Sequence, residues 1–177
     1  MKKATLVLAA LALIAGKSLA QNASASAAQQ TSLSLANAIV LSFTTTGSSN
    51  VNVNFASLQD MNNGVETIDH QVLVQSNLPF DVDVTTPTNF SYAGSYTSNT
   101  TMPVVNKFKM KIMDNSTGGT NAIGNGFSNV TGNLTTLFTN CPAGGNATFD
   151  IRYKLIPGPT YSPGIYSMNV VYTATQL

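Results

Sequence analysis

The pattern that most constrains the fold of this chain is the strict alternation of apolar and polar side chains in its closing segment, residues 149–177. Residues 149–155 read FDIRYKL, in which apolar Phe149, Ile151, Tyr153 and Leu155 alternate with charged Asp150, Arg152 and Lys154. Residues 166–174 alternate in the same way. A period of two is typical of a strand with one buried face, whereas the prolines and glycines of residues 156–164 must turn the chain. We therefore predict a strand, a loop and a strand that pair antiparallel at the edge or seam of a larger sheet.

Similar alternating segments recur from residue 33 onward. We predict strands at residues 33–43, with an irregularity at Ala36-Asn37, and at residues 51–55, 70–75, 80–84 and 107–113. An alternative for residues 70–75 and 80–84 is one strand bent at Pro79. The stretches 59–69, 85–101 and 114–125 are rich in turn residues, and residues 127–138 show no clean period.

Helical patterns are missing from this sequence, since no stretch of ten or more residues carries an apolar stripe with helical spacing. Roughly seven to nine short strands, separated by turn signals, predict an all-β fold, an antiparallel immunoglobulin-like β-sandwich. A closed barrel is the competing architecture. We expect little helix.

The first twenty residues have the layout of a secretion signal. Lys2 and Lys3 precede an uncharged, mostly apolar run at residues 4–16, and Ser18-Leu19-Ala20 places small residues where a signal peptidase cleaves. That run is about half the length that spans a bilayer. We expect residues 1–20 to be a cleaved signal peptide, residues 21–31 to be a flexible N-terminal arm, and residues 32–177 to be one β-sandwich domain.

Charge is scarce, at 8% of all residues. Three of the eight basic residues, Lys2, Lys3 and Lys17, lie in the leader, so the exported chain keeps five bases against seven acids. A slightly negative chain offers no electrostatic surface for nucleic acid or for an anionic membrane. We predict no nucleic-acid partner and no membrane insertion after cleavage of the leader.

Residue types that catalysis and metal binding need are also scarce. The chain has one histidine, His70, and one cysteine, Cys141, so no zinc site of ordinary spacing can be assembled. No motif supports a Ser–His–Asp or Cys–His site. We interpret His70 as a surface or strand-end residue, and Cys141 as buried and inert, with a reactive thiol or an intermolecular disulfide as the alternative. We expect no enzymatic activity and no cofactor.

Two clusters have a functional interpretation besides the structural one. Asp60, Glu66 and Asp69 could supply oxygen ligands to Ca²⁺, but their spacing is not that of an EF-hand loop, and we favour solvated loop acids. Phe90, Tyr92 and Tyr96 alternate in a Ser/Thr-rich stretch. Exposed, these rings would stack on sugars; buried, they would cover the sandwich, which we favour.

Two segments are similar to exported bacterial surface proteins. Residues 157–166, PGPTYSPGIY, lead through a Pro-Gly turn and a tyrosine into the final strand, which contains VVYTA at residues 170–174. This segment resembles the C-terminal strand of fimbrial-subunit-like proteins, spore-coat-U-like proteins and WxL-type cell-surface domains. Residues 60–82 also look like secreted proteins of Bacteroidota. The resemblance implies an immunoglobulin-like sandwich with a surface or fimbrial role, although the chain has no Trp for a WxL motif and no second cysteine for a pilin disulfide.

We therefore predict a structural or adhesive module, fimbrial- or surface-layer-like, exported to the periplasm, outer surface or extracellular space of a Gram-negative bacterium. Its expected partners are other copies of itself or other surface or fimbrial subunits, joined by strand addition. The candidate donor strand carries Leu33, Leu35, Ile39, Leu41 and Phe43 on one face. The alternative is that this strand pairs within its own sheet. A second hypothesis is a carbohydrate- or polymer-binding module that uses Phe90, Tyr92 and Tyr96.

Overall fold

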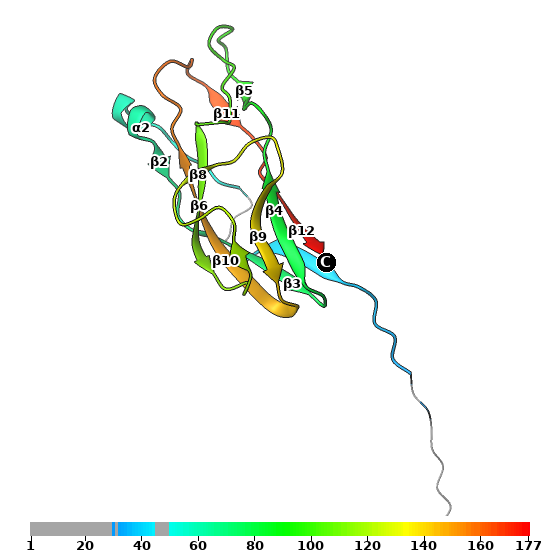
Figure 1. Cartoon of the computed structure of the whole chain (residues 1–177). Helices are drawn as coiled ribbons and strands as arrows, with labels where there is room; N and C mark the ends of the chain where they lie inside the picture. Colours follow the sequence, from blue (N-terminus) through cyan, green and yellow to red (C-terminus); the bar gives the residue numbers. More distant parts are fainter. Residues whose placement is uncertain (1–29, 31, 45–49) are drawn as a thin grey trace, which may run out of the picture. The chain divides into compact units, whose positions relative to one another are not determined.

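The computed structural model describes residue 30, residues 32–44 and residues 50–177 (Figure 1). The chain divides into two compact units, residues 1–35 and residues 36–177, and the fold described below is that of the second. The predicted signal peptide, residues 1–20, lies outside the described residues, as does the predicted arm, residues 21–31, apart from Gln30. Within the described part, no helix is long and apolar enough to cross a membrane.

Strands make up most of the regular structure. In chain order the elements are β1 (Ile39–Phe43), α2 (Leu58–Asn63), β2 (Val65–Glu66), β3 (His70–Ser76), β4 (Phe80–Thr85), β5 (Ser91–Ala93), β6 (Phe108–Asn115), β7 (Thr120–Asn121), β8 (Ser128–Asn129), β9 (Thr135–Cys141), β10 (Gly144–Leu155), β11 (Ile165–Ser167) and β12 (Val171–Gln176). Seven of the described strands have five or more residues, and the other five are pieces of two or three residues.

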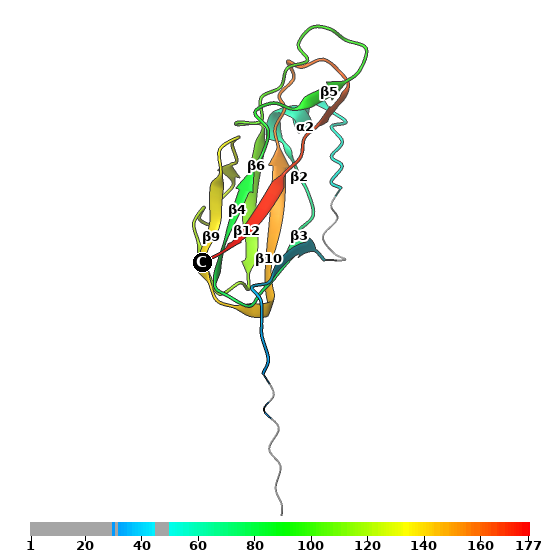
Figure 2. The same cartoon turned by 90° about the vertical axis from the view of Figure 1, so that its right-hand side faces the viewer.

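Two larger sheets form the layers of a sandwich (Figure 2). One has the order β1-β3-β10-β6-β8, with β2 also paired to β10, and the other has the order β12-β4-β9-β7. A small third sheet pairs β5 with β11. Every pairing between these strands is antiparallel, and the sheets do not close into a barrel. The predicted all-β antiparallel sandwich is therefore confirmed.

Side chains from both sheets fill the space between the layers, as the alternation predicts. Phe149 and Ile151 of β10 are fully buried, and so are Val72 and Val74 of β3. The ring of Phe149 lies 4.9 Å from that of Phe138 on β9, measured between centroids, so the two sheets meet through aromatic packing. Burial of these apolar surfaces is the main force that holds the layers together.

The partners of the closing strands differ from the prediction. β10 lies inside the larger sheet, between β3 and β6, whereas β12 pairs with β4 in the other sheet. The two strands therefore do not form the predicted antiparallel pair. The Pro/Gly-rich residues 156–164 lead from β10 to β11 of the small third sheet, and the chain enters β12 only after β11. β12 does lie at a sheet edge, as predicted.

Other boundaries also differ from the prediction. The first strand begins at Ile39 rather than at residue 33, and residues 51–55 form no strand. β3 and β4 lie in different sheets, so the alternative of one strand bent at Pro79 is wrong. α2, whose start is capped by Ser57, covers the first part of the stretch predicted as loop at residues 59–69.

Cys141 lies at the end of β9 and is fully buried. Burial raises the pKa of its thiol, although a hydrogen bond with Thr117 acts in the opposite direction. A protonated, solvent-shielded thiol is a poor nucleophile and a poor partner for a disulfide between chains. The structure therefore supports the interpretation of Cys141 as a packing residue.

Candidate functional site

β1 covers only part of the outer edge of β3. The ladder between them runs from Ser76 to Val72 on β3, and next to it Thr44 N–H donates a 3.1 Å hydrogen bond to Gln71 C=O. Past that point, no strand of the described chain pairs with the outer side of residues 65–70. We call this side of residues 65–70 the open edge. An unpaired edge is a template for another extended chain.

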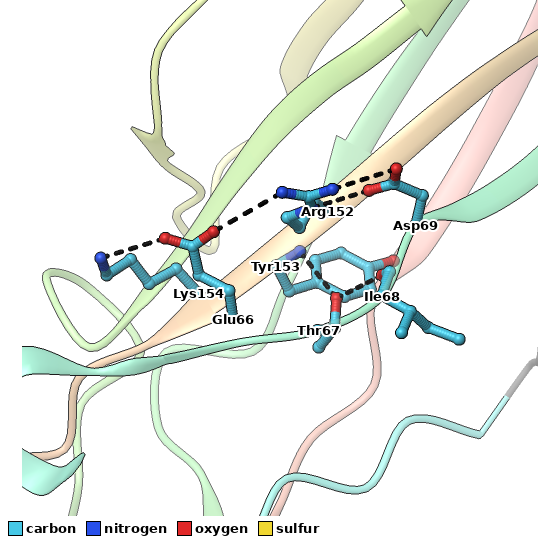
Figure 3. Close-up of polar contacts among 7 residues, drawn as sticks. All are labelled: Glu66, Thr67, Ile68, Asp69, Arg152, Tyr153 and Lys154. Atoms are coloured by element: carbon cyan, nitrogen blue, oxygen red, sulfur yellow. Dashed lines mark hydrogen bonds and ion pairs between the residues drawn. The ribbon is translucent and has the colours of Figure 1, made fainter.

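The inner side of the same stretch is held by β10. β2, formed by Val65 and Glu66, pairs with β10, and Thr67 N–H donates to Tyr153 C=O at 3.0 Å. The Thr67 hydroxyl accepts a further hydrogen bond from Tyr153 N–H at 3.1 Å (Figure 3). Among the described residues, no group accepts a hydrogen bond from Ile68 N–H.

A cluster of ion pairs fixes residues 66–69 onto β10 (Figure 3). The Arg152 guanidinium donates to both carboxylate oxygens of Asp69, at 2.7 Å from Nε and 3.1 Å from Nη2. Glu66 lies between two bases, with Oε2 at 3.8 Å from Arg152 Nη1 and Oε1 at 3.2 Å from Lys154 Nζ. Such partly exposed pairs contribute little net stability. Their bidentate geometry nevertheless sets the position of this stretch on the sheet.

The three acids considered as calcium ligands are not gathered into one site. The Asp60 carboxylate accepts hydrogen bonds from the N–H groups of Ala56 and Ser57 at 3.1 and 3.0 Å, which makes it part of the cap of α2. Glu66 and Asp69 are engaged with bases instead. Among the described residues, no three His, Cys, Asp or Glu side chains come together as a metal site would require.

A cleft of about 420 Å³ lies between the open edge and residues 50–54. Its lining consists of Asn50, Val51, Asn52, Val53, Asn54, Val65, Glu66, Thr67, Ile68 and His70. Residues 51–55 alternate as a strand would, yet they form no hydrogen bond with the open edge.

His70 lies at the inner end of this cleft and is only 3% exposed. Its ring stacks on that of Tyr153, with centroids 5.6 Å apart. Within the described part of the chain, neither ring nitrogen has a hydrogen-bond partner. Burial lowers the pKa of His70, and the nearby Asp69 carboxylate opposes that shift. His70 is at the start of a strand as predicted, but the interpretation as a surface residue is wrong.

The lowered pKa of His70 predicts that the fold loses stability as the pH falls below about 6.5. Between the unfolded pKa near 6.5 and the lower folded pKa, the unfolded chain binds more protons, so the free energy of unfolding decreases with decreasing pH. Above about pH 6.5 His70 is neutral in both the folded and the unfolded chain, so it no longer lowers the free energy of unfolding. Urea midpoints at about pH 7.5 and about pH 5 measure the effect. His70→Phe keeps a ring against Tyr153 but does not titrate, and an equally strong pH dependence in that variant would contradict the assignment to His70.

The predicted donor segment is divided by the structure. Ile39, Leu41 and Phe43 belong to β1, pair within their own sheet with β3, and are half-buried against the core. Leu33 and Leu35 lie outside any strand and are 84% and 78% exposed. Only the first part of the segment is thus available to a partner.

The aromatic residues considered for glycan stacking do not form one platform. Phe90 is buried in the core at 7% exposure. Tyr92 donates its hydroxyl to Pro163 C=O at 2.9 Å, and its ring fills the space where a side chain at Gly164 would lie. Tyr96 is 53% exposed. The structure does not bring the three rings together at the surface.

Comparisons with known proteins add little to this geometry. No protein-family model matches the sequence, and no curated protein sequence matches it. Among solved structures, a family 123 glycoside hydrolase from Clostridium perfringens, described for glycolipid glycan hydrolysis, is similar over 78% of this chain with 13% identity and a TM-score of 0.37. This chain aligns with 25% of that enzyme's length. Similarity at that level says nothing about the function of this chain.

Proposed function

We propose that this protein is a non-enzymatic structural module that assembles by strand addition, with residues 32–36 of one copy pairing along the open edge of the next. The observation that carries the proposal is the side of residues 65–70 that no strand among the described residues pairs with, beside a cleft of about 420 Å³. Ile68, between β2 and β3 at this edge, is 75% exposed and so presents a large apolar side chain to a partner. Backbone hydrogen bonds would supply affinity, and the cleft would accept alternate side chains.

The donor has the composition that such an edge requires. Residues 32–36 read SLSLA, so that Leu33 and Leu35 project to one side and serines to the other. The side chains of Leu33 and Leu35 are 84% and 78% exposed. The segment is uncharged, and its five residues are close in number to the six residues of the open edge.

Chain length requires that the donor come from a second copy. Ala38 is held at the far end of β3 by Asn77, whose side-chain Oδ1 accepts from Ala38 N–H at 2.9 Å. The six residues back to Ser32 span at most roughly 21 Å. From Ser76 to Thr67 the strand direction covers roughly 30 Å. A chain therefore cannot place its own residues 32–36 on its own open edge.

The chemistry of the described residues supports a structural rather than a catalytic role. His70 is buried and its ring nitrogens contact no hydroxyl or carboxylate in the described chain, so no acid–base pair is formed. Cys141 is buried with a raised pKa. Export through residues 1–20 and display at a Gram-negative surface remain predictions from the sequence, and they place such a module where fimbrial or surface assemblies form.

Sedimentation velocity of the purified exported chain over a series of concentrations tests the proposal. Each copy carries one donor and one acceptor, so the contact is head-to-tail and does not close on itself in a dimer. We expect a ladder of dimers, trimers and longer oligomers that shifts upward with concentration. A chain that stays monomeric at all concentrations, or that stops at a dimer, would contradict the proposal.

A further inference from the structure

β5 and β11 lie together at one end of the sandwich (Figure 1). The loops next to these two strands line a second depression. It has a volume of about 370 Å³ and lies between the loop after β5 and the loop before β11. The residues that line it are Thr97, Asn99, Thr100, Thr101, Thr160 and Tyr161. Its size falls at the lower end of the range of roughly 300–1,000 Å³ typical of small-molecule sites.

Hydrogen bonds between the two loops fix the walls of this depression. Ser162 donates its hydroxyl to Ser98 C=O at 2.6 Å and its N–H to Asn99 C=O at 3.0 Å. The Tyr166 hydroxyl bonds to Ser162 C=O at 2.9 Å and to Asn99 C=O at 3.3 Å. A site whose walls are already held in place loses less conformational freedom when a ligand binds.

Side chains that line the depression have unused hydrogen-bonding capacity. The hydroxyls of the four threonines and the side-chain amide of Asn99 form no hydrogen bond with any described group. Each hydroxyl both donates and accepts, and the amide does the same through separate atoms. None of the lining residues carries a charge at neutral pH. The lining therefore suits a ligand with many hydroxyl groups and no charge.

Tyr161 adds an aromatic surface to this polar lining. Its ring is half-buried and lies 6.3 Å from the ring of Tyr166, in an edge-on arrangement that holds its orientation. The Lys107 ammonium lies over the same ring, 5.7 Å from the centroid. A sugar ring has an apolar C–H face and a rim of hydroxyls, which are the two surfaces that Tyr161 and the threonines complement.

We propose that this depression binds a neutral oligosaccharide, with Tyr161 against the apolar face of one sugar and the threonine hydroxyls and Asn99 amide bonded to its hydroxyls. The site shares no residue with the open edge, so it adds glycan attachment to the assembly proposed above and does not depend on it. It also replaces Phe90, Tyr92 and Tyr96 as the glycan contact, since the structure keeps those three rings apart.

Binding of the full exported chain to a glycan array tests this site. The array carries neutral oligosaccharides of glucose, galactose, mannose and N-acetylglucosamine, together with sulfated and uronic-acid oligosaccharides on the same surface. We expect binding to at least one neutral oligosaccharide. Binding to none of them, or to the charged oligosaccharides alone, would overturn the proposal.

Variants then locate the site by titration calorimetry with the neutral oligosaccharide that binds. We expect Tyr161→Ala to weaken binding about tenfold. Asn99 has a left-handed backbone with φ of 53°, which glycine adopts freely, so Asn99→Gly removes the amide without strain and should weaken binding severalfold. Thr100→Val removes one hydroxyl with little change in size and is expected to have the same effect.

Two control variants distinguish loss of the binding site from a general loss of structure. Tyr96→Ala removes an exposed tyrosine that does not line the depression, and Thr173→Val removes an exposed hydroxyl on β12. Both should bind as the unmodified chain does. Unchanged affinity in Tyr161→Ala and Asn99→Gly together, with normal melting temperatures, would show that the glycan binds elsewhere and would overturn the assignment.

Discussion

Replacement of Phe149 by alanine is expected to lower the free energy of unfolding by about 3–5 kcal/mol. Phe149 is fully buried in β10, and its ring lies 4.9 Å from Phe138 and 6.2 Å from Tyr172, both in the other sheet. Truncation removes apolar contacts to both of these residues and leaves a cavity between the layers. Domains of this kind are stable by only about 5–15 kcal/mol, so the loss is a large part of the total.

Urea unfolding of the unmodified protein and of Phe149→Ala, monitored by circular dichroism, measures the difference in the free energy of unfolding. Leu134→Ala is the matched control because Leu134 is apolar but 65% exposed, and it should change the free energy of unfolding by less than about 0.5 kcal/mol. If Phe149→Ala cost no more than the control, the ring would not lie between two packed sheets.

The Ile68→Lys variant is expected to lose all oligomers while keeping its fold. Ile68 is 75% exposed beside the open edge, so its replacement removes few contacts within the chain. A lysine on an edge opposes the approach of another strand, because addition would bury its charge. Sedimentation velocity should show a monomer at concentrations where the unmodified chain forms a ladder, and the melting temperature should be unchanged.

Leu58→Lys provides the control for this change. Leu58 is also a large exposed apolar residue, at 67%, but it lies in α2 and does not line the cleft beside the open edge. The same charge is added at a similar exposure, so a general effect of lysine on solubility would appear in both variants. Loss of the ladder in Leu58→Lys as well would mean that the open edge is not the acceptor.

The strands themselves were predictable because alternation is a local signal. Phe149, Ile151 and Tyr153 face the core as their spacing indicates, and residues 166–174 keep their predicted half-buried parity. Pairing is not local, since the pattern of a strand does not say which neighbour it joins. For that reason β10 and β12 were expected to pair with each other, whereas they lie in different sheets.

Two features had a sequence signal that alternation alone did not use. Ser57 and Asp60 are spaced as a capping box, which marks the start of α2 just before the stretch predicted as loop. His70 shares its parity with Val72 and Val74, so the side of the strand that it occupies faces the core. Extending the alternation of Val72 and Val74 back to His70 would have predicted that its side chain is buried.

The open edge and the polar depression had no such signal. The edge is open because no strand of the described residues pairs with it, and residues 51–55 alternate without joining a ladder. The depression combines the loop around Asn99 with the loop around Tyr161, which are brought together by the pairing of β5 with β11. Both features depend on contacts between distant parts of the chain, which a single sequence does not display.

Mixing two defective variants tests the central claim most directly. Leu33→Ser with Leu35→Ser removes the donor but keeps the acceptor, whereas Ile68→Lys removes the acceptor but keeps the donor. Each is expected to be monomeric alone, and an equimolar mixture is expected to form a dimer and nothing longer, because only one productive contact remains. A mixture that stays monomeric, or longer oligomers from either variant alone, would contradict strand addition at the open edge.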